Sequence, residues 1–377
     1  MGVETEPGKE AGPTDLLTRG VAALRGLLPA GWVVEVAAAP VADSPTAGDA
    51  VISVGAPRGR SASILVAVRG GVAPRDVGTL FGGRSPLPAM DPSVPVAVFA
   101  PWVSPRSRVL LAERDIGYVD LTGNVCLHLD RPAVVLRTAG AEQDPDPPRR
   151  GSVSVRGTIA GRVVRLLADV QPPYTASGIG AAAGVSVPYV SRLLGALDRE
   201  ALIRRGPRSL VVDVDWVDLL RRRAETYRLF DTNGAHGYLS GTGPRDVVDR
   251  LRAGQVPYRA VTGSFAAVQR APVAAPGQLT VYVDDPAATA DDLGLLPADA
   301  GADVVLLTAY DVAVFDRAEV VDGLRVVAPS QLAVDCLAGN GRMPAEGEAL
   351  LGWMAADVTR WRRPGLAGLP PRGGAGR

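Results

Sequence analysis

The sequence is poor in the residues from which many catalytic and structural sites are built. It has two cysteines, Cys126 and Cys336, and two histidines, His128 and His236, among 377 residues. Two cysteines so far apart predict neither a disulfide framework nor a structural zinc site, and neither histidine has partners at the spacing of a metal site or triad. Phosphate-binding loops, dinucleotide-binding glycine motifs and nucleophile elbows are also missing. We therefore predict no catalytic residue, no metal site and no cofactor.

Long apolar runs and lysine are scarce as well. No uninterrupted apolar run is long enough to cross a bilayer, and the N-terminus lacks a signal-peptide core, so we expect a cytoplasmic protein without membrane contact. Lys9 is the only lysine, and the 40 basic residues are balanced by 40 acidic residues. A bias toward arginine, alanine, glycine and proline is typical of a GC-rich coding sequence. The 47% hydrophobic content is enough for two or three cores.

The most informative stretch covers residues 174–214 and has the pattern of two helices joined by a tight turn and followed by a β-hairpin. Thr175 can cap the first helix, and Gly184 stands at the turn, where a positive φ is needed. Ser186 can cap the second helix, with Pro188 in its first turn, where a missing N–H costs little. Apolar residues at helical spacing predict the inward face of the second helix: Val190, Leu193, Leu194 and Leu197.

Polar and basic residues occupy the other face of this second helix and the hairpin. The outer face keeps Tyr189, Ser191, Arg192 and Arg199. The hairpin is expected to pair residues 203–205 with residues 209–212 across a Gly206-Pro207 turn, with arginines at its tip. Residues 156–223 contain eleven arginines and six acidic residues, which gives a local excess of five positive charges. Such a local excess is the electrostatic pattern that phosphate binding needs.

This arrangement resembles the winged-helix transcriptional regulators of the MarR/IclR type, over roughly residues 156–223. The resemblance implies that the second helix enters the major groove of duplex DNA. The residues then nearest the base edges are Ser186, Pro188, Tyr189, Ser191 and Arg192, with Arg192 reading guanine. The phosphate contacts would come from Arg204, Arg205 and Arg208 on the wing, together with the N–H groups at the helix start. Thr175 is expected as a further DNA-binding residue.

Two features of this stretch leave other interpretations open. Gly180 stands where alanine is usual in this family, and we expect it to loosen the first helix slightly. The same pattern would also fit a plain helical hairpin inside a core.

Residues 15–140 alternate helix and strand patterns after a polar tail at residues 1–14, which predicts an α/β layer. Helices are expected over residues 16–28 and 104–113. Strands are expected over residues 32–36, 50–54, 63–69, 96–100 and 125–129. This order, with the run SPRSRVLLAERDIGYVDLTGN, resembles the PD-(D/E)xK restriction-endonuclease-like fold.

Active members of that fold hold a divalent metal with an acid on one strand and a D/E-x-K motif on the next. The candidate acid here is Asp49, but the D/E-x-K position reads Ala67-Val68-Arg69. The second carboxylate and the lysine are both missing, and arginine cannot accept a proton. We therefore interpret the domain as a degenerate nuclease-like scaffold, with a metal-dependent DNA nuclease guided by the winged helix as the alternative. Nearby, Asp120 and Asn124 are expected to form a turn closed by Asx side-chain bonds to the local backbone.

Two boundaries are expected in the rest of the chain, a Pro- and charge-rich linker at residues 141–150 and a second at residues 231–237. Between them, a supporting helix is expected at residues 158–170 and one long helix at residues 216–230. The run at residues 221–223, three arginines, would either contact phosphates or form a solvated face. Trp216 is expected to pack rather than stack on bases.

Residues 238–360 show a further α/β pattern, followed by a Pro/Gly/Arg tail at residues 364–377 that is expected to be disordered. Helices are expected over residues 244–252, 264–269, 330–337 and 344–357, and strands over residues 259–261, 279–283, 304–307 and 324–327. The stretches AVTGSFAAVQ, LTVYVDD and GADVVLLTAYD, together with the run VVAPSQLAVDCLAGNGRMPAEGEALLGWM, resemble the C-terminal domain of AbiEi-type antitoxins and related regulators of type IV toxin–antitoxin systems. The resemblance implies a cognate toxin as a candidate partner.

Gly263-Ser264 followed by a strand that ends in acids is also similar to the nucleotidyltransferase pattern. That chemistry needs two carboxylates on one face of a strand. The residues that share a face here are Thr280, Tyr282 and Asp284, of which only one is acidic. Nucleotide transfer is therefore not expected.

The combined prediction is an α/β multidomain protein with a nuclease-like N-terminal domain, a central winged helix-turn-helix and a C-terminal α/β domain. We expect a transcriptional regulator that binds double-stranded DNA. A winged helix alone reads few base pairs, so a homodimer on a two-fold site would extend the sequence that is read.

Overall fold

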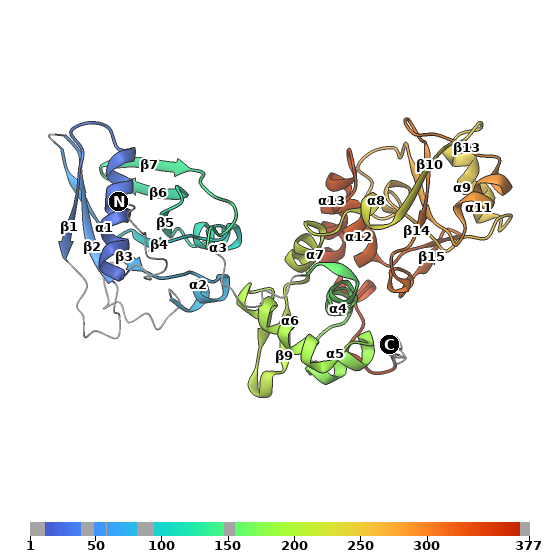
Figure 1. The fold of residues 1–377 in the computed structure, drawn as a ribbon, viewed down its shortest axis with the longest axis horizontal. Helices are drawn as coiled ribbons and strands as arrows, with labels where there is room; N and C mark the ends of the chain where they lie inside the picture. The colour runs from blue at the N-terminus through green and yellow to red at the C-terminus, as the bar shows by residue number, and fades with distance from the viewer. Residues whose placement is uncertain (1–11, 39–48, 58, 81–93, 147–154, 370–377) are drawn as a thin grey trace, which may run out of the picture. The chain divides into compact units, whose positions relative to one another are not determined.

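Figure 1 shows the computed structural model, which describes residues 12–38, 49–57, 59–80, 94–146 and 155–369. Within these ranges the protein is mixed α/β, with thirteen α-helices and two seven-stranded mixed sheets. The chain divides into two compact units, residues 1–151 and residues 152–377. Residues 1–11 of the expected N-terminal tail lie outside the described ranges, and the first helix already begins at Pro13.

The first unit is built on a seven-stranded sheet whose strands follow one another in chain order. The central strands β3, β4 and β5 are parallel, and the other neighbours are antiparallel. The strands are β1 (Val33–Ala38), β2 (Asp49–Gly55), β3 (Ser61–Val68), β4 (Val96–Ala100), β5 (Gly117–Asp120), β6 (Val125–Asp130) and β7 (Ala133–Thr138). All five expected strands are confirmed. β5 and β7 were not predicted. β7 exposes Val135 at 75%, so it has little of the apolar alternation that marks a half-buried strand.

Helices cover both faces of this sheet. α1 (Pro13–Leu27) buries Leu16, Leu17 and Leu24 in one cluster with alternate strand residues such as Phe99. α2 (Pro74–Leu80) and α3 (Pro105–Ala112) contribute Val77 and Leu111 to a second cluster on the opposite face. α3 confirms a predicted helix, including its Ser104 cap, whereas α2 was not predicted.

The second unit contains the other large sheet, in the order β13-β10-β14-β12-β11-β16-β15. Its strands are β10 (Gly234–Leu239), β11 (Ala260–Thr262), β12 (Leu279–Tyr282), β13 (Leu296–Pro297), β14 (Val304–Thr308), β15 (Glu319–Val321) and β16 (Leu324–Val326). The helices that follow residue 240 are α9 (Pro244–Arg252), α10 (Ser264–Ala267), α11 (Pro286–Leu293), α12 (Pro329–Leu337) and α13 (Met343–Ala356). The expected helices and strands of residues 238–360 are all present, while β10, α11, β13 and β15 were not predicted.

The helices of residues 156–232 share one hydrophobic core with this sheet. They are α4 (Gly157–Asp169), α5 (Ala176–Ala183), α6 (Val187–Arg199), α7 (Trp216–Ala224) and α8 (Leu229–Thr232). A hairpin of β8 (Ile203–Arg205) and β9 (Val211–Val214) follows α6. Residues 156–232 and the C-terminal sheet are therefore packed together in one unit.

One expectation about the helices of this unit is wrong. The single helix expected over residues 216–230 is interrupted between α7 and α8, where Tyr227 turns inward and is 1% exposed. The boundary expected at residues 231–237 falls on the end of α8 and the start of β10, where the chain passes directly from helix to sheet.

The C-terminal segment also differs from the expected tail. Residues 357–369, called the C-terminal strap below, fold back onto α4. The Arg363 N–H donates to the Asp169 carbonyl at 2.9 Å, and Leu366 and Leu369 pack against the main core. Apolar contacts thus order the first part of the expected tail, and residues 370–377 lie outside the described ranges.

Within the described residues, no single helix is long and apolar enough to cross a membrane. α5 and α6 reach the length and apolar composition of a membrane span only when the two helices are counted together, and they are bent by 116° relative to each other.

Candidate nucleic-acid interface

α5 and α6 form a tightly bent helix pair whose turn is set by one glycine. The chain bends by 116° between them, within the usual range for two helices joined by a short turn in DNA-binding proteins. Gly184 ends α5 in the left-handed region, with φ of 65°, as predicted. A residue with a Cβ would be strained there.

The two predicted helix caps have different outcomes. Thr175 caps α5, since its Oγ1 accepts a hydrogen bond from the Gly178 N–H at 3.1 Å. Ser186 occupies the cap position of α6, but its side chain makes no capping hydrogen bond, so that part of the prediction is wrong. Pro188, in the first turn as predicted, has no N–H and removes one of the two donors that a cap usually satisfies. The exposed Ser186 hydroxyl is therefore not used as a cap.

Gly180 lies in α5 where the following turn packs onto the helix, and the expectation that it loosens the helix stays a prediction. The Val185 N–H donates to the Gly180 carbonyl at 2.9 Å. A Cβ added at Gly180 would lie 2.8 Å from the Val185 oxygen, closer than such atoms pack. Glycine at this position lets the turn approach the helix.

The two faces of α6 separate as predicted, with one exception. Val190, Leu193, Leu194 and Leu197 are at most 1% exposed. The exposed residues of α6 on the other side include Pro188, Ser191, Arg192 and Arg199. Tyr189 is the exception. It is half-buried against the core, and this burial raises the pKa of its phenol.

The hairpin arginines fall into three environments. Arg204 is exposed and lies 3.7 Å from Asp213 on the neighbouring strand. Arg205 is half-buried along α6, where it donates to the Ser191 carbonyl at 3.4 Å, so it is not at the tip. Arg208 is exposed at the tip, in a 3-10 turn (Pro207–Ser209) with φ of 56°. Because of this turn, β9 begins at Val211 and not at the predicted residue 209.

Most other arginines of residues 156–223 have partners inside the protein. Arg162 pairs with Asp311 at 2.8 Å, Arg221 with Glu348 at 2.6 Å, and Arg222 with Glu200 at 3.1 Å. Arg223 is 4% exposed and donates to the Val155 carbonyl at 2.7 Å. The run at residues 221–223, left open between phosphate contact and a solvated face, thus connects α7 to its neighbours.

Arg192, Arg199 and Arg208 differ from these residues. Within the described part of the chain, no hydrogen bond or ion pair engages any of the three. All three are exposed, two on the outer face of α6 and one at the hairpin tip. The charges of these three arginines are therefore not neutralised by ion pairs within the described residues.

Arg165 holds α4 against the C-terminal part of the unit. The side chain is almost fully buried, and its guanidinium donates to Ser330 Oγ at 3.0 Å and Gln331 Oε1 at 2.7 Å. It also donates to the carbonyls of Ala313 and Asp316 at 3.1 and 3.0 Å. Burial lowers the pKa of this guanidinium, and neighbouring acidic groups oppose that effect. The large cost of burying the charge is thus offset by several hydrogen bonds.

A buried carboxylate continues this network into the sheet. Gln331 Nε2 donates to Asp335 Oδ1 at 2.7 Å, and Asp335 also accepts from Tyr227 at 2.9 Å, Thr262 at 2.7 Å and Tyr282 at 3.2 Å. Burial raises the pKa of Asp335, while the donated hydrogen bonds lower it. A chain of hydrogen bonds therefore runs from α4 to strands β11 and β12.

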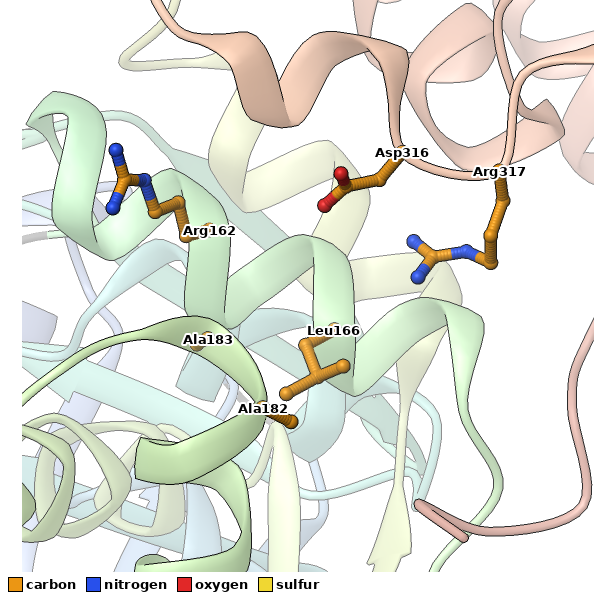
Figure 2. A pocket seen from close by; sticks show the side chains of 6 residues that line it. All are labelled: Arg162, Leu166, Ala182, Ala183, Asp316 and Arg317. Atoms are coloured by element: carbon orange, nitrogen blue, oxygen red, sulfur yellow. The ribbon is translucent and has the colours of Figure 1, made fainter. Parts of the chain in front are cut away.

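Figure 2 shows a small hollow where α4 and the end of α5 meet the segment around residue 316. The lining residues are Arg162, Leu166, Ala182, Ala183, Asp316 and Arg317. The cavity volume is about 10 Å³, room for about one water molecule. The hollow is a packing defect between elements and is too small for an organic ligand.

In the first unit, the nuclease-like positions lie next to each other without the second acid. Asp49 is the first residue of β2 and pairs with Ala67 of β3; its side chain lies outside the described residues. Ala67 is buried, and Arg69 donates to the Val68 carbonyl at 3.0 Å. No group of three or more histidine, cysteine or acidic residues in the described ranges could hold a metal ion.

Asp120 and Asn124 form the expected turn and extend it. Asp120 Oδ1 accepts from the backbone N–H groups of Thr122 and Asn124, each at 2.9 Å, which confirms the Asx interpretation. Its other oxygen accepts from the Val103 N–H at 3.1 Å, and Asn124 Oδ1 accepts from the Gly140 N–H at 2.8 Å. The pair thus ties together three chain segments after β4, β5 and β7.

The strand that resembles the nucleotidyltransferase pattern presents no acid pair. Thr280 and Tyr282 are buried, whereas Asp284 is exposed beside Arg259 at 3.7 Å. Asp285 caps α11 by accepting from two backbone N–H groups.

Comparison with known proteins adds no relative to this description. No family model matches the chain, and no curated protein and no solved structure is similar to it.

Proposed function

We propose that residues 156–223 act as a winged helix-turn-helix that binds duplex DNA, and that the protein is a sequence-specific transcriptional regulator. The observation that carries this proposal is the set of exposed arginines Arg192, Arg199 and Arg208, which have no ion-pair partner among the described residues. Surface arginines without partners suit phosphate and base recognition, because each can give its whole guanidinium to the nucleic acid.

Each of these arginines is assigned a role from its position. Arg192 lies in the first half of α6, one turn after the exposed Pro188 and next to Ser191, and the N-terminal part of a recognition helix contacts base edges. Its guanidinium fits the two acceptors of guanine. Arg208 at the hairpin tip and Arg199 near the end of α6 are assigned to phosphates, which set the register of the protein on the duplex.

The other predicted DNA contacts, Thr175, Arg204 and Arg205, have partners within the protein and are assigned smaller roles. Thr175 accepts the Gly178 N–H with its side chain, and we assign the N–H groups of the two residues before Gly178, Ala176 and Ser177, to a phosphate. Arg204 shares its charge with Asp213, and Arg205 is held along α6. We therefore assign Arg205 to positioning the hairpin against α6.

The test is a fluorescence-anisotropy titration of full-length protein with duplexes chosen by sequence selection, at several salt concentrations. Arg192→Ala should cost about 1–3 kcal/mol of binding free energy on the preferred site and relax preference at one base pair. Arg208→Ala should weaken binding to every duplex alike and reduce the salt slope by about one.

Two results would contradict the proposal. Wild-type protein that binds no duplex at low ionic strength would exclude DNA as the partner. Indistinguishable effects of Arg192→Ala and Arg208→Ala would leave DNA binding in place and show that the separate roles are wrong.

A further inference from the structure

The C-terminal strap, residues 357–369, joins the end of α4 through its backbone. The Arg363 N–H donates to the Asp169 carbonyl at 2.9 Å, and the Gln171 N–H donates to the Arg363 carbonyl at 2.8 Å. Val170 and Arg363 form a parallel β-bridge. The strap therefore runs alongside the segment that leads from α4 into α5.

Two side chains fix the strap in this place. Arg362 donates to the carbonyls of Ala168 and Val170 at 2.8 and 2.9 Å, and so satisfies acceptors that the end of α4 leaves open. Trp361 packs edge-on against Trp216 with ring centroids 4.8 Å apart. These contacts use side chains that face the core, so they leave the outer side of the strap available.

The far end of the strap reaches the first turn of α5. A Cβ added at Gly178 would lie 3.0 Å from Leu366 Cδ1, and the Gly178 N–H is the group that Thr175 caps. The strap thus borders the helix whose start is expected to face the DNA backbone.

Arg363 is the strap arginine whose charge faces solvent without a carboxylate beside it. Its side chain is exposed, and the hydrogen bond recorded for it within the described residues is a long one, 3.3 Å, to the Ala367 carbonyl. Arg360, three residues earlier, pairs with Asp357 at 3.1 Å. Arg362 uses its guanidinium on α4. Arg363 therefore adds an exposed positive charge to the strap, three residues before Leu366, the residue that contacts α5.

We propose that the C-terminal strap extends the DNA-binding surface and that Arg363 contacts a backbone phosphate beside the first turn of α5. This inference rests on the proposed function. The contact carries no sequence information, because phosphates are the same at every base pair. It would add to the phosphate contacts of the hairpin from a segment about 150 residues further along the chain than Arg208.

The experiment measures the affinity of full-length protein for a preferred and a scrambled duplex over a series of salt concentrations. Arg363→Ala should reduce the slope of log K against log salt by about one and lower affinity for both duplexes by the same factor. Arg363→Lys should keep the wild-type slope, since the charge remains. Arg360→Ala, on the same strap but ion-paired, should also keep it. Thermal melting of each variant controls for the fold.

The results separate this inference from the proposed function. Wild-type binding together with an unchanged slope in Arg363→Ala overturns the role of the strap and leaves DNA binding intact. An equal loss of slope in Arg360→Ala overturns the assignment to Arg363. Wild-type protein that binds neither duplex overturns both proposals.

Discussion

The arginines on α4 and α7 and those on α6 and the hairpin tip have the same chemistry and opposite surroundings. On α4 and α7, Arg165 and Arg223 are buried and donate to oxygens of the protein itself. On α6 and the hairpin tip, Arg192 and Arg208 are exposed, with no ion-pair partner in the described residues. One set holds the second unit together, and the other is available to bind a partner.

This difference changes how the charge of the segment is interpreted. The local excess of five positive charges in residues 156–223 suggests a broad basic surface. Several of those charges are instead neutralised by acids outside the segment, such as Asp311 and Glu348. The surface available to phosphate is narrower than the net charge implies, and position decides which arginines belong to it.

The largest expected effect is on stability, at Arg165. Arg165→Met should lower the free energy of unfolding by about 3–5 kcal/mol, because it leaves the buried acceptors Ser330 Oγ and Gln331 Oε1 without their donor. Urea unfolding measures this loss. Arg192→Ala is the matched exposed control and should change stability by no more than about 0.5 kcal/mol. A loss of unfolding free energy below about 1 kcal/mol in Arg165→Met would show that the buried arginines do not stabilise the protein more than the exposed ones.

Two glycines of the helix pair differ in the space around them, Gly180 at the packed turn and Gly195 on α6. Gly180→Ala should lower the free energy of unfolding by about 1–3 kcal/mol, because its Cβ meets the Val185 oxygen. Gly195→Ala, on α6, has only Arg205 at 3.9 Å and should stabilise by up to about 1 kcal/mol. Thermal unfolding of both variants gives the comparison. Equal effects of the two substitutions would show that the turn does not pack as described.

Removing the acidic partner of Arg204 should make this hairpin arginine available to the DNA, like Arg192 and Arg208. Asp213→Asn keeps an acceptor for the Val214 N–H but removes the charge beside Arg204. Duplex binding should strengthen by up to about 1 kcal/mol, the range of an exposed ion pair, with a steeper salt dependence. An affinity equal to that of the wild type would mean that Arg204 lies away from the DNA.

The smallest expected effect is at Arg221. Arg221→Ala breaks exposed pairs with Asp218 and Glu348, so stability should fall by no more than about 1 kcal/mol. The salt slope of duplex binding should not change, because this charge is already neutralised. A slope reduced by about one would place α7 in the DNA-binding surface after all.

Local patterns in the sequence predicted the helix pair well. Gly184, the Thr175 cap and the inward face of α6 depend on residues a few positions apart, and all are present as expected. Strands β2 to β4 follow from short apolar runs in the same way. The missing Ser186 hydrogen bond had a local signal too, since Pro188 removes a donor.

Contacts between distant residues were not predictable in this way. Arg162 and Asp311 are 149 residues apart in the sequence, and periodicity within either helix says nothing of such a pair. The same holds for the strap, because a Pro- and Gly-rich segment has no regular pattern to mark its contact with α4. Arg165 is a further case. On a helical wheel it is simply a polar residue, and only the packed structure supplies its four acceptors.

The Arg165 network also bears on how such a gene can recombine. A crossover that moved only the codons for residues 156–223 into another gene would separate Arg165 of α4 from Ser330 and Gln331. It would also expose the apolar side chains of these helices that the rest of the second unit covers. Such a product would aggregate or be degraded, so we expect the second half of the gene to be inherited as one piece.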